Sequence, residues 1–306
     1  NPATQIVINL GIVALLYCGS FQVNSGALSQ GNLVALVNYM TQMFLALVVL
    51  ANLFVIFTKA AASAGRIEAI LKTEPAITGG ITELSKDKDA VLEMDKVSFG
   101  YSEGESAIEQ ISFTIQPHQT VGLIGGTGCG KSTIVQLLPR LIDPTAGEIR
   151  LGGVPLRELS LADLRRQIRI VPQKAVLFSG TIRENLRWGN QDADDAALWQ
   201  ALTLAQARDF VEAMPQGLDT LLVQGGKNCS GGQRQRLCIA RALVGRPSLL
   251  VLDDSTSALD YQTDARLRQS LKKIEGSPAV LIVSQRIASI RHADFILVLE
   301  QGRITQ

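Results

Sequence analysis

No aspartate, glutamate, lysine, arginine or histidine occurs before Lys59, whereas the rest of the chain has the composition of a soluble domain. Two apolar runs, 6–21 and 33–57, fill this part, and a loop rich in Gly, Ser and Asn joins them. A helix of about 20 apolar residues crosses a bilayer, so the second run is long enough and the first nearly so. Adjacent runs without a charge are typical of lipid surroundings, and they predict membrane helices at about 5–21 and 33–58.

Basic residues follow the second run, at Lys59, Arg66 and Lys72. By the positive-inside rule, that end of the helix faces the cytoplasm and the loop between the helices lies outside. Helical spacing continues through GRIEAIL until Pro75. We predict the end of a transmembrane domain at 1–72, a polar linker at 73–90 and a cytoplasmic domain at 91–306, in a multi-pass protein of the plasma or inner membrane.

The overall charge of the chain is nearly balanced. It has 29 Lys plus Arg against 28 Asp plus Glu, which gives a net charge of +1. Proteins that bind DNA or RNA carry basic patches, so we expect no nucleic acid among the partners. The four cysteines are scattered without a C-x-x-C pair, which argues against a zinc site or a disulfide framework.

After Val91 the pattern changes to short β-rich runs that alternate with helical stretches. The runs are VLEMDKVSF, SFTI, TVGLIG, EIRL, IRIVPQ, SLLVLD, AVLIVS and FILVLEQGRI. Alternation of this kind predicts an α/β domain with a largely parallel sheet and a ligand at the carboxyl ends of the strands.

The run TVGLIG leads into a glycine-rich loop that fits G-x-x-x-x-G-K-[ST] and then into a helical stretch. Glycines let backbone N–H groups converge on phosphate oxygens without a Cβ in the way. Lys131 would reach the β- and γ-phosphates, and the Ser132 hydroxyl would hold Mg²⁺. The predicted residues of this ATP and Mg²⁺ site are Gly125, Gly126, Thr127, Gly128, Cys129, Gly130, Lys131, Ser132 and Thr133.

The apolar run at 249–252 ends in two acids, Asp253 and Asp254. An acid at the tip of a buried strand beside a P-loop is placed to orient Mg²⁺ or its water ligands. We assign this role to Asp253, together with Ser132.

The segment Cys229-Ser230-Gly231-Gly232-Gln233 opens another helix and presents a second set of glycines at a helix start. With this segment the chain resembles the ATP-binding cassette (ABC) family, whose signature is usually written LSGGQ. The resemblance covers nearly the whole chain. It implies a P-loop NTPase domain of ABC type with a helical subdomain at about 175–245. It also implies a head-to-tail dimer, in which Ser230, Gly231, Gly232 and Gln233 close over the nucleotide of the partner.

The same resemblance implies roles for further residues. Tyr101 matches the aromatic residue that stacks on adenine, and Gln173 matches the glutamine that links Mg²⁺ to the coupling helices of the membrane domain. The loop Ser257–Asp260 matches the loop that crosses the dimer interface, with Asp260 near the nucleotide. The two apolar helices look like the last two of an exporter half-transporter, and family members continue beyond GRITQ with a short tail.

Two positions depart from the family pattern. A glutamate that polarises the attacking water normally follows the metal-binding aspartate, and this chain has Asp254 there. The switch histidine that normally precedes an arginine is Gln285, which cannot titrate. A misplacement of about 1 Å can reduce a rate roughly 10²-fold. We therefore expect a site that binds ATP and hydrolyses it slowly.

This combination resembles the degenerate subunit of a heterodimeric exporter, whose partner half-transporter has the glutamate and the histidine. Alternatives are a homodimeric exporter with a slow but genuine site, a soluble ABC ATPase acting on DNA, RNA or ribosomes, and a nucleotide-binding regulator that never turns over. The transported substrate stays open among small molecules, lipids and peptides.

Overall fold

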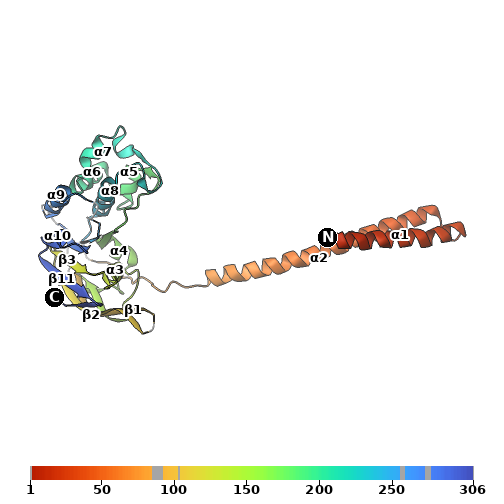
Figure 1. Ribbon diagram of the computed structural model, residues 1–306, viewed down its shortest axis with the longest axis horizontal. Coiled ribbons are helices and arrows are strands. Elements are labelled where there is room, and N and C mark those ends of the chain that lie inside the picture. The colour runs from red at the N-terminus through yellow and green to blue at the C-terminus, as the bar shows by residue number, and fades with distance from the viewer. Residues whose placement is uncertain (1, 85–91, 103, 256–258, 273–276, 306) are drawn as a thin grey trace. The chain divides into compact units, whose positions relative to one another are not determined.

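The computed structural model describes residues 2–84, 92–102, 104–255, 259–272 and 277–305. The chain divides into two compact units, Asn1–Ala76 and Ile77–Gln306. The first unit is helical and the second is an α/β domain (Figure 1). This confirms the predicted fold class of an apolar helical segment followed by a P-loop NTPase domain.

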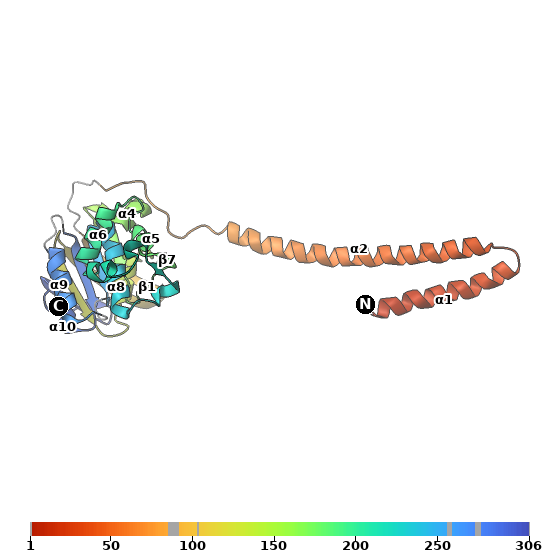
Figure 2. The same cartoon turned by 90° about the horizontal axis from the view of Figure 1, so that it is seen from above.

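The first unit is a pair of helices, α1 (Pro2–Asn24) and α2 (Gln30–Leu71), that run antiparallel and pack on each other (Figure 2). Both are long and apolar enough to cross a membrane. At 1.5 Å per residue, α2 spans about 60 Å, roughly twice the thickness of a hydrocarbon core. A helix of this length that crossed a bilayer would extend well beyond it, and the cytoplasmic extension after position 58 stays a prediction.

The contact between α1 and α2 depends on a small residue. A Cβ added at Gly19 would lie 2.2 Å from a methyl carbon of Leu33, so the two backbones approach closely there. Small residues allow this kind of close packing between membrane helices. No residue of α2 is buried, and large apolar side chains such as Phe57 (71% exposed) cover its surface. The apolar surface of this unit is thus available to lipid or to further helices.

The second unit is built on two main sheets. The larger has the order β12-β11-β3-β10-β9-β6, with β12 antiparallel at its edge and the other five strands parallel. Its strands are β3 (Thr120–Gly125), β6 (Ile168–Val171), β9 (Leu249–Asp253), β10 (Ala279–Ser284), β11 (Phe295–Glu300) and β12 (Arg303–Ile304).

The other main sheet is antiparallel and has the order β2-β1-β4-β5. Its strands are β1 (Leu92–Ser102), β2 (Glu105–Ile115), β4 (Ala146–Leu151) and β5 (Val154–Pro155). A short pair, β7 (Gly180–Thr181) and β8 (Leu221–Leu222), lies apart from both.

The expectation of one largely parallel sheet was therefore wrong for VLEMDKVSF, SFTI and EIRL, which lie in β1, β2 and β4. The physical difference is visible in the burial patterns. The C-terminal half of β2 alternates between buried and exposed residues, as in an antiparallel sheet with one covered face, whereas β10 is buried along its whole length.

Helices cover the parallel sheet on both faces. Helix α3 packs against β2, β3 and β9, and so lies between the two main sheets. Helices α5, α6, α7 and α8 gather in a separate lobe (Figure 1). The helices of this unit are α3 (Lys131–Leu137), α4 (Leu161–Gln167), α5 (Ile182–Arg187), α6 (Asp195–Leu204), α7 (Arg208–Glu212), α8 (Gly231–Val244), α9 (Tyr261–Lys272) and α10 (Ile287–Ile290), with 3₁₀ turns at Gly217–Asp219 and Gln224–Gly226.

Part of the predicted linker is hydrogen-bonded to the backbone of the second unit just before α4. The N–H of Gly80 donates to the carbonyl of Leu159 at 2.9 Å, and the N–H of Thr82 donates to that of Glu158 at 3.0 Å. A Cβ at Gly80 would lie 2.0 Å from the Glu158 oxygen, so only glycine fits. Positions 85–90 of the predicted linker lie outside the described residues.

The orientation of the helix pair can be tested by cysteine accessibility in the full-length protein, in a background without the native cysteines. We expect Ala27→Cys, in the loop between α1 and α2, to react with a membrane-impermeant maleimide in intact cells. Thr73→Cys, just after α2, should react only after permeabilisation, because the basic residues hold that end in the cytoplasm. The opposite labelling pattern would contradict this topology.

Candidate nucleotide-binding site

Three neighbouring parallel strands end together at one edge of the larger sheet. In the register of the sheet, Ser284 of β10 pairs with Ile124 of β3, and Val283 pairs with Asp253 of β9. The loops after β3, β9 and β10 therefore begin side by side. These loops carry the glycine-rich motif, the two acids and Gln285.

The loop between β3 and α3 has a backbone that depends on glycine. Gly130 has φ of +106°, and a Cβ there would lie 2.5 Å from Ile108 and 2.7 Å from the carbonyl of Ala107. A Cβ at Gly125 would lie 2.3 Å from the Leu299 oxygen. The loop is thus pressed against β2 and β11, which fixes its shape before any ligand binds.

The donors of this loop fit a phosphate chain. Gly126, Thr127, Gly128 and Ser132 are exposed, and no side chain caps the start of α3 at Gly130, so its N–H groups are left for an anion. The Lys131 ammonium donates to the carbonyls of Gly125 at 2.8 Å and Gly126 at 2.5 Å, which places its charge within the loop. Cys129 and Thr133 are buried beneath the loop and contribute to its packing.

The two acids after β9 supply oxygen ligands beside Lys131. Burial raises the pKa of the Asp253 carboxyl, the negative charge of Asp254 raises it further, and the charge of Lys131 lowers it. A half-buried carboxylate in this setting favours a nearby cation. Together with the exposed Ser132 hydroxyl, this donor set suits Mg²⁺, which prefers oxygen ligands. The residues present therefore fit MgATP.

Both carboxylate oxygens of Asp254 accept hydrogen bonds from other side chains. The Gln173 amide donates to one oxygen at 3.2 Å, and the Ser284 hydroxyl donates to the other at 3.4 Å. The backbone N–H of Asp254 donates to the Val283 carbonyl at 2.8 Å, and its φ is +44°. Gln173, predicted from the resemblance, thus meets the acid of the catalytic position although 81 residues separate them.

Gln285 directly follows Ser284 at the same edge and is exposed. Tyr101, near the end of β1, lies beside α3: its hydroxyl is 3.3 Å from the Thr133 hydroxyl, and the side chain is 63% exposed. Its ring packs edge-to-face against Phe99 with the centroids 4.9 Å apart, and the exposed part of the ring is accessible beside α3.

The residues of CSGGQ lie elsewhere in the unit. Helix α8 packs against α5, α6 and β6, whereas α3 packs against β2, β3 and β9 (Figure 1). Ser230 caps α8 by accepting from the N–H of Gln233 at 3.2 Å, and the Gln233 side chain accepts from the Ser230 N–H at 2.8 Å. Gly231 is exposed at this helix start, and Gly232 is partly exposed.

The predicted interface loop is described only at its end. Ser257 and Ala258 lie outside the described residues, and Asp260 precedes α9. The carboxylate of Asp260 accepts from the N–H of Thr263 at 2.9 Å and from its hydroxyl at 2.7 Å. These bonds lower the pKa of Asp260 and make it a cap of its own helix.

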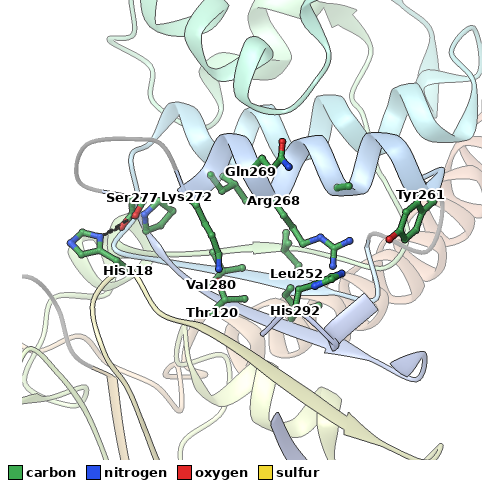
Figure 3. Close-up of a pocket in the computed structure, with 14 residues that line it drawn as sticks. His118, Thr120, Leu252, Tyr261, Arg268, Gln269, Lys272, Ser277, Val280 and His292 are labelled. Carbon is green, nitrogen blue, oxygen red and sulfur yellow. Dashed lines mark hydrogen bonds between the residues drawn. The ribbon is translucent and has the colours of Figure 1, made fainter. Parts of the chain in front are cut away.

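A cavity of about 360 Å³ lies between α9 and the strands β9 and β10 (Figure 3). Its apolar lining includes Leu252, Val280 and Ile282, and none of the predicted site residues lines it. The candidate nucleotide site is instead an open edge with exposed glycines. An open edge of this kind encloses a ligand only when a second surface covers it.

Two features of this region were not predicted from the sequence. One is Ser284, whose hydroxyl contacts Asp254 but whose position in the sequence is an ordinary strand end. The other is an exposed aromatic pair, which Phe178 forms with Trp188 at the end of α5. The rings of Phe178 and Trp188 stack at 4.9 Å, and the two side chains are 46% and 65% exposed.

The charge balance at Asp253 can be tested with Asp253→Asn. Because its folded pKa is raised, the ionised carboxyl costs stability as pH rises through that pKa, and at neutral pH this cost is present. The neutral amide removes it, so the apparent Tm of the nucleotide-free protein should rise by roughly 1–3 °C.

The same substitution should abolish Mg²⁺-dependent nucleotide binding, measured by titration with a fluorescent ATP analogue. Asp192→Asn, at an exposed carboxylate in the helical lobe, is the matched control and should change neither quantity. A lower Tm for Asp253→Asn would contradict the inferred charge balance.

Comparison with known proteins agrees with this geometry. Residues 108–257 match the sequence model of the family described as ABC transporter. An uncharacterized ABC transporter ATP-binding protein of Bacillus subtilis, YfiB, is 41% identical over all of this chain and 53% of its own length. A multidrug resistance ABC transporter ATP-binding and permease protein of Lactococcus lactis is 37% identical over all of this chain and 52% of its own.

Among solved structures, a bacterial Atm1-family ABC exporter with ATP bound superposes with a TM-score of 0.84 at 30% identity. The match covers 100% of this chain and 54% of that one. The chain thus spans about half the length of the relatives that it matches. With its glycine-rich loop and its paired acids, the domain that includes residues 108–257 belongs to the ABC transporter family.

Proposed function

We propose that the chain is the ATP-binding part, with adjoining membrane helices, of an ABC exporter subunit. ATP binding and dimer closure would drive efflux of a small molecule, lipid or peptide across the cell membrane. The observation that carries this proposal is the edge of the parallel sheet. There the glycine-rich loop, Asp253, Asp254 and Gln173 come together as a nucleotide site that is open on one side.

The open side supports a dimer. The exposed glycine loop and the exposed start of α8 lie in different parts of one chain, so each needs a surface from a second subunit. A head-to-tail pair provides both contacts at once, because the CSGGQ segment of each subunit covers the other's loop. We infer a second half-transporter as the partner.

The chemistry of the site supports slow hydrolysis. Asp254 has the charge of a general base, but its carboxylate is held by Gln173 and Ser284 and is one methylene shorter than glutamate. General-base assistance is worth roughly 10²–10⁴-fold in rate. Gln285 can donate a hydrogen bond but cannot carry the charge of a histidine. The site therefore holds nucleotide to set the state of the dimer, and the partner's site supplies most of the turnover.

The exposed aromatic pair of Phe178 and Trp188 supports the coupling part of the proposal. Phe178 lies five residues after Gln173 in the chain, and the Arg241 guanidinium lies 5.8 Å from the centre of its ring. Exposed apolar groups that gather in one place can serve as a contact site for another protein segment. A membrane-domain segment docked there would move Gln173 and so change the contact with Asp254.

The slow-site proposal is tested by introducing the family's usual residues at positions 254 and 285. Asp254→Glu with Gln285→His should raise ATP turnover of the assembled transporter by about 10-fold or more at this site, because a base and a titratable switch residue return. Single-site turnover after trapping of the partner's site is the measurement.

The matched control makes the same two types of substitution at exposed residues of the helical lobe, Gln191→His with Asp192→Glu, and should leave turnover unchanged. An unchanged rate in the Asp254→Glu, Gln285→His protein would contradict the slow-site proposal. If the chain forms a homodimer with a genuine slow site, the rate would rise equally at both sites and no second type of subunit would copurify.

The assignment of CSGGQ to the partner's site is tested with Ser230→Ala. We expect nucleotide trapping to fall at the partner's site more than at this chain's own site. Loss of an N-cap also costs about 1 kcal/mol of stability. Ser160→Ala, which removes the equivalent cap of α4, is therefore the control. It should lower stability comparably without a preference for the partner's site; equal loss at both sites with Ser230→Ala would contradict the assignment.

A further inference from the structure

Ser284 occupies the last position of β10, between the strand that leads into the glycine-rich loop and the strand that leads into the acids. It pairs with Ile124 of β3, and its neighbour Val283 pairs with Asp253 of β9. The side chain is 1% exposed. A buried hydroxyl at this junction has to find its partners among the surrounding loops.

One partner of the Ser284 hydroxyl is the acid Asp254 of the candidate nucleotide site, and the other lies in the loop after β10. The hydroxyl donates to a carboxylate oxygen of Asp254 at 3.4 Å and accepts from the N–H of Arg286 at 3.0 Å. A serine hydroxyl has one hydrogen to donate and lone pairs to accept with, so a single orientation makes both bonds. Gln285 lies between Ser284 and Arg286 in the chain. The hydroxyl therefore ties the acid to the loop that carries the switch position.

The connection continues on the other side of Asp254. Its second oxygen accepts from Gln173 at 3.2 Å. One line of hydrogen bonds thus joins the loop after β6, the loop after β9 and the loop after β10. A displacement of any one of the three loops would therefore change the hydrogen bonds to Asp254 and so affect the positions of the other two loops.

The length of the side chain at position 254 matters for this line. A glutamate would carry its carboxylate about 1.5 Å further from the backbone, one carbon–carbon bond. Its carboxylate would therefore meet the Ser284 hydroxyl and the Gln173 amide in a different arrangement from the one that Asp254 has. The aspartate is therefore matched to Ser284 and Gln173, although it is a poor general base.

We propose that Ser284 is a positioning residue, which acts through Asp254 to hold the Gln173 loop and the Gln285 loop in one arrangement. The inference rests on the proposed function, since it takes this edge to be the nucleotide site. It gives Asp254 a second role there, as the connection between the loop that carries Gln173 and the loop that carries Gln285.

The first test needs no nucleotide. Hydrogen exchange of the Arg286 amide in the nucleotide-free full-length protein should become about 5- to 10-fold faster in Ser284→Ala, because a hydrogen bond is lost. Ser284→Thr keeps the hydroxyl and should restore slow exchange. Ser289→Ala, a nearby serine in α10, is the matched control and should leave the rate unchanged.

The second test separates positioning from general stability. In the assembled transporter, Ser284→Ala should reduce turnover at this site about 10-fold while KM for ATP stays within about 2-fold, and Ser284→Thr should restore turnover. In an Asp254→Ala background, Ser284→Ala should have no further effect on turnover, because the two residues act as one unit.

Unchanged exchange at Arg286, or an equal loss of turnover with and without Asp254, would overturn the proposal. Should Ser284→Ala fold poorly, Asp254→Ala is the second variant: exchange at Arg286 should still rise, since the hydroxyl loses its anchor, and an unchanged rate would again overturn it. Failure of the proposed function is distinguishable, because Asp254→Glu with Gln285→His would then leave turnover unchanged while the exchange effects persist.

Discussion

The parallel pairing of β3, β10 and β9 is the constraint on which the site depends. These strands come from residues 120–125, 279–284 and 249–253, and hydrogen bonds in a fixed register bring their carboxyl ends to one edge. Both outer strands are packed against β10, all of whose residues are buried. A slip of this register would separate the glycine-rich loop from the acids, because each loop starts where its strand ends.

Asp254 keeps an acid at the position after Asp253, and we propose that its main role there is to hold loops together. Its carboxylate is short for a general base, yet it accepts hydrogen bonds from Gln173 and Ser284. The slow hydrolysis that we propose and these loop contacts would have one cause, the length of the side chain. On this proposal the subunit keeps the hydrogen bonds between its loops, and the other site of the dimer carries out most of the hydrolysis.

The segment after the long helix α2 has a defined attachment to the nucleotide-binding unit. Gly80 and Thr82 pair with the backbone just before α4, and Leu84 donates from its N–H to the Asp163 carboxylate at 2.8 Å. Helix α4 leads directly into β6, and Gln173 follows the end of β6. The chain that follows α2 is therefore hydrogen-bonded to residues 158–163, which lie 10 to 15 residues before Gln173.

The sequence by itself determined the features that rest on local chemistry. A stretch of almost sixty residues without a charge specified apolar helices, and the glycines with Lys131 and Ser132 specified a phosphate loop, because only those residue types serve such surroundings. Only the tertiary structure decided that β1, β2 and β4 form a separate antiparallel sheet, and that Ser284 meets Asp254. The pairing of β1 with β4, and of β10 with β3 and β9, joins strands that are far apart in the sequence, and no spacing along the chain carries that information. The parallel pairing of strands far apart in sequence placed the hydroxyl, the acid and the glutamine within hydrogen-bonding distance.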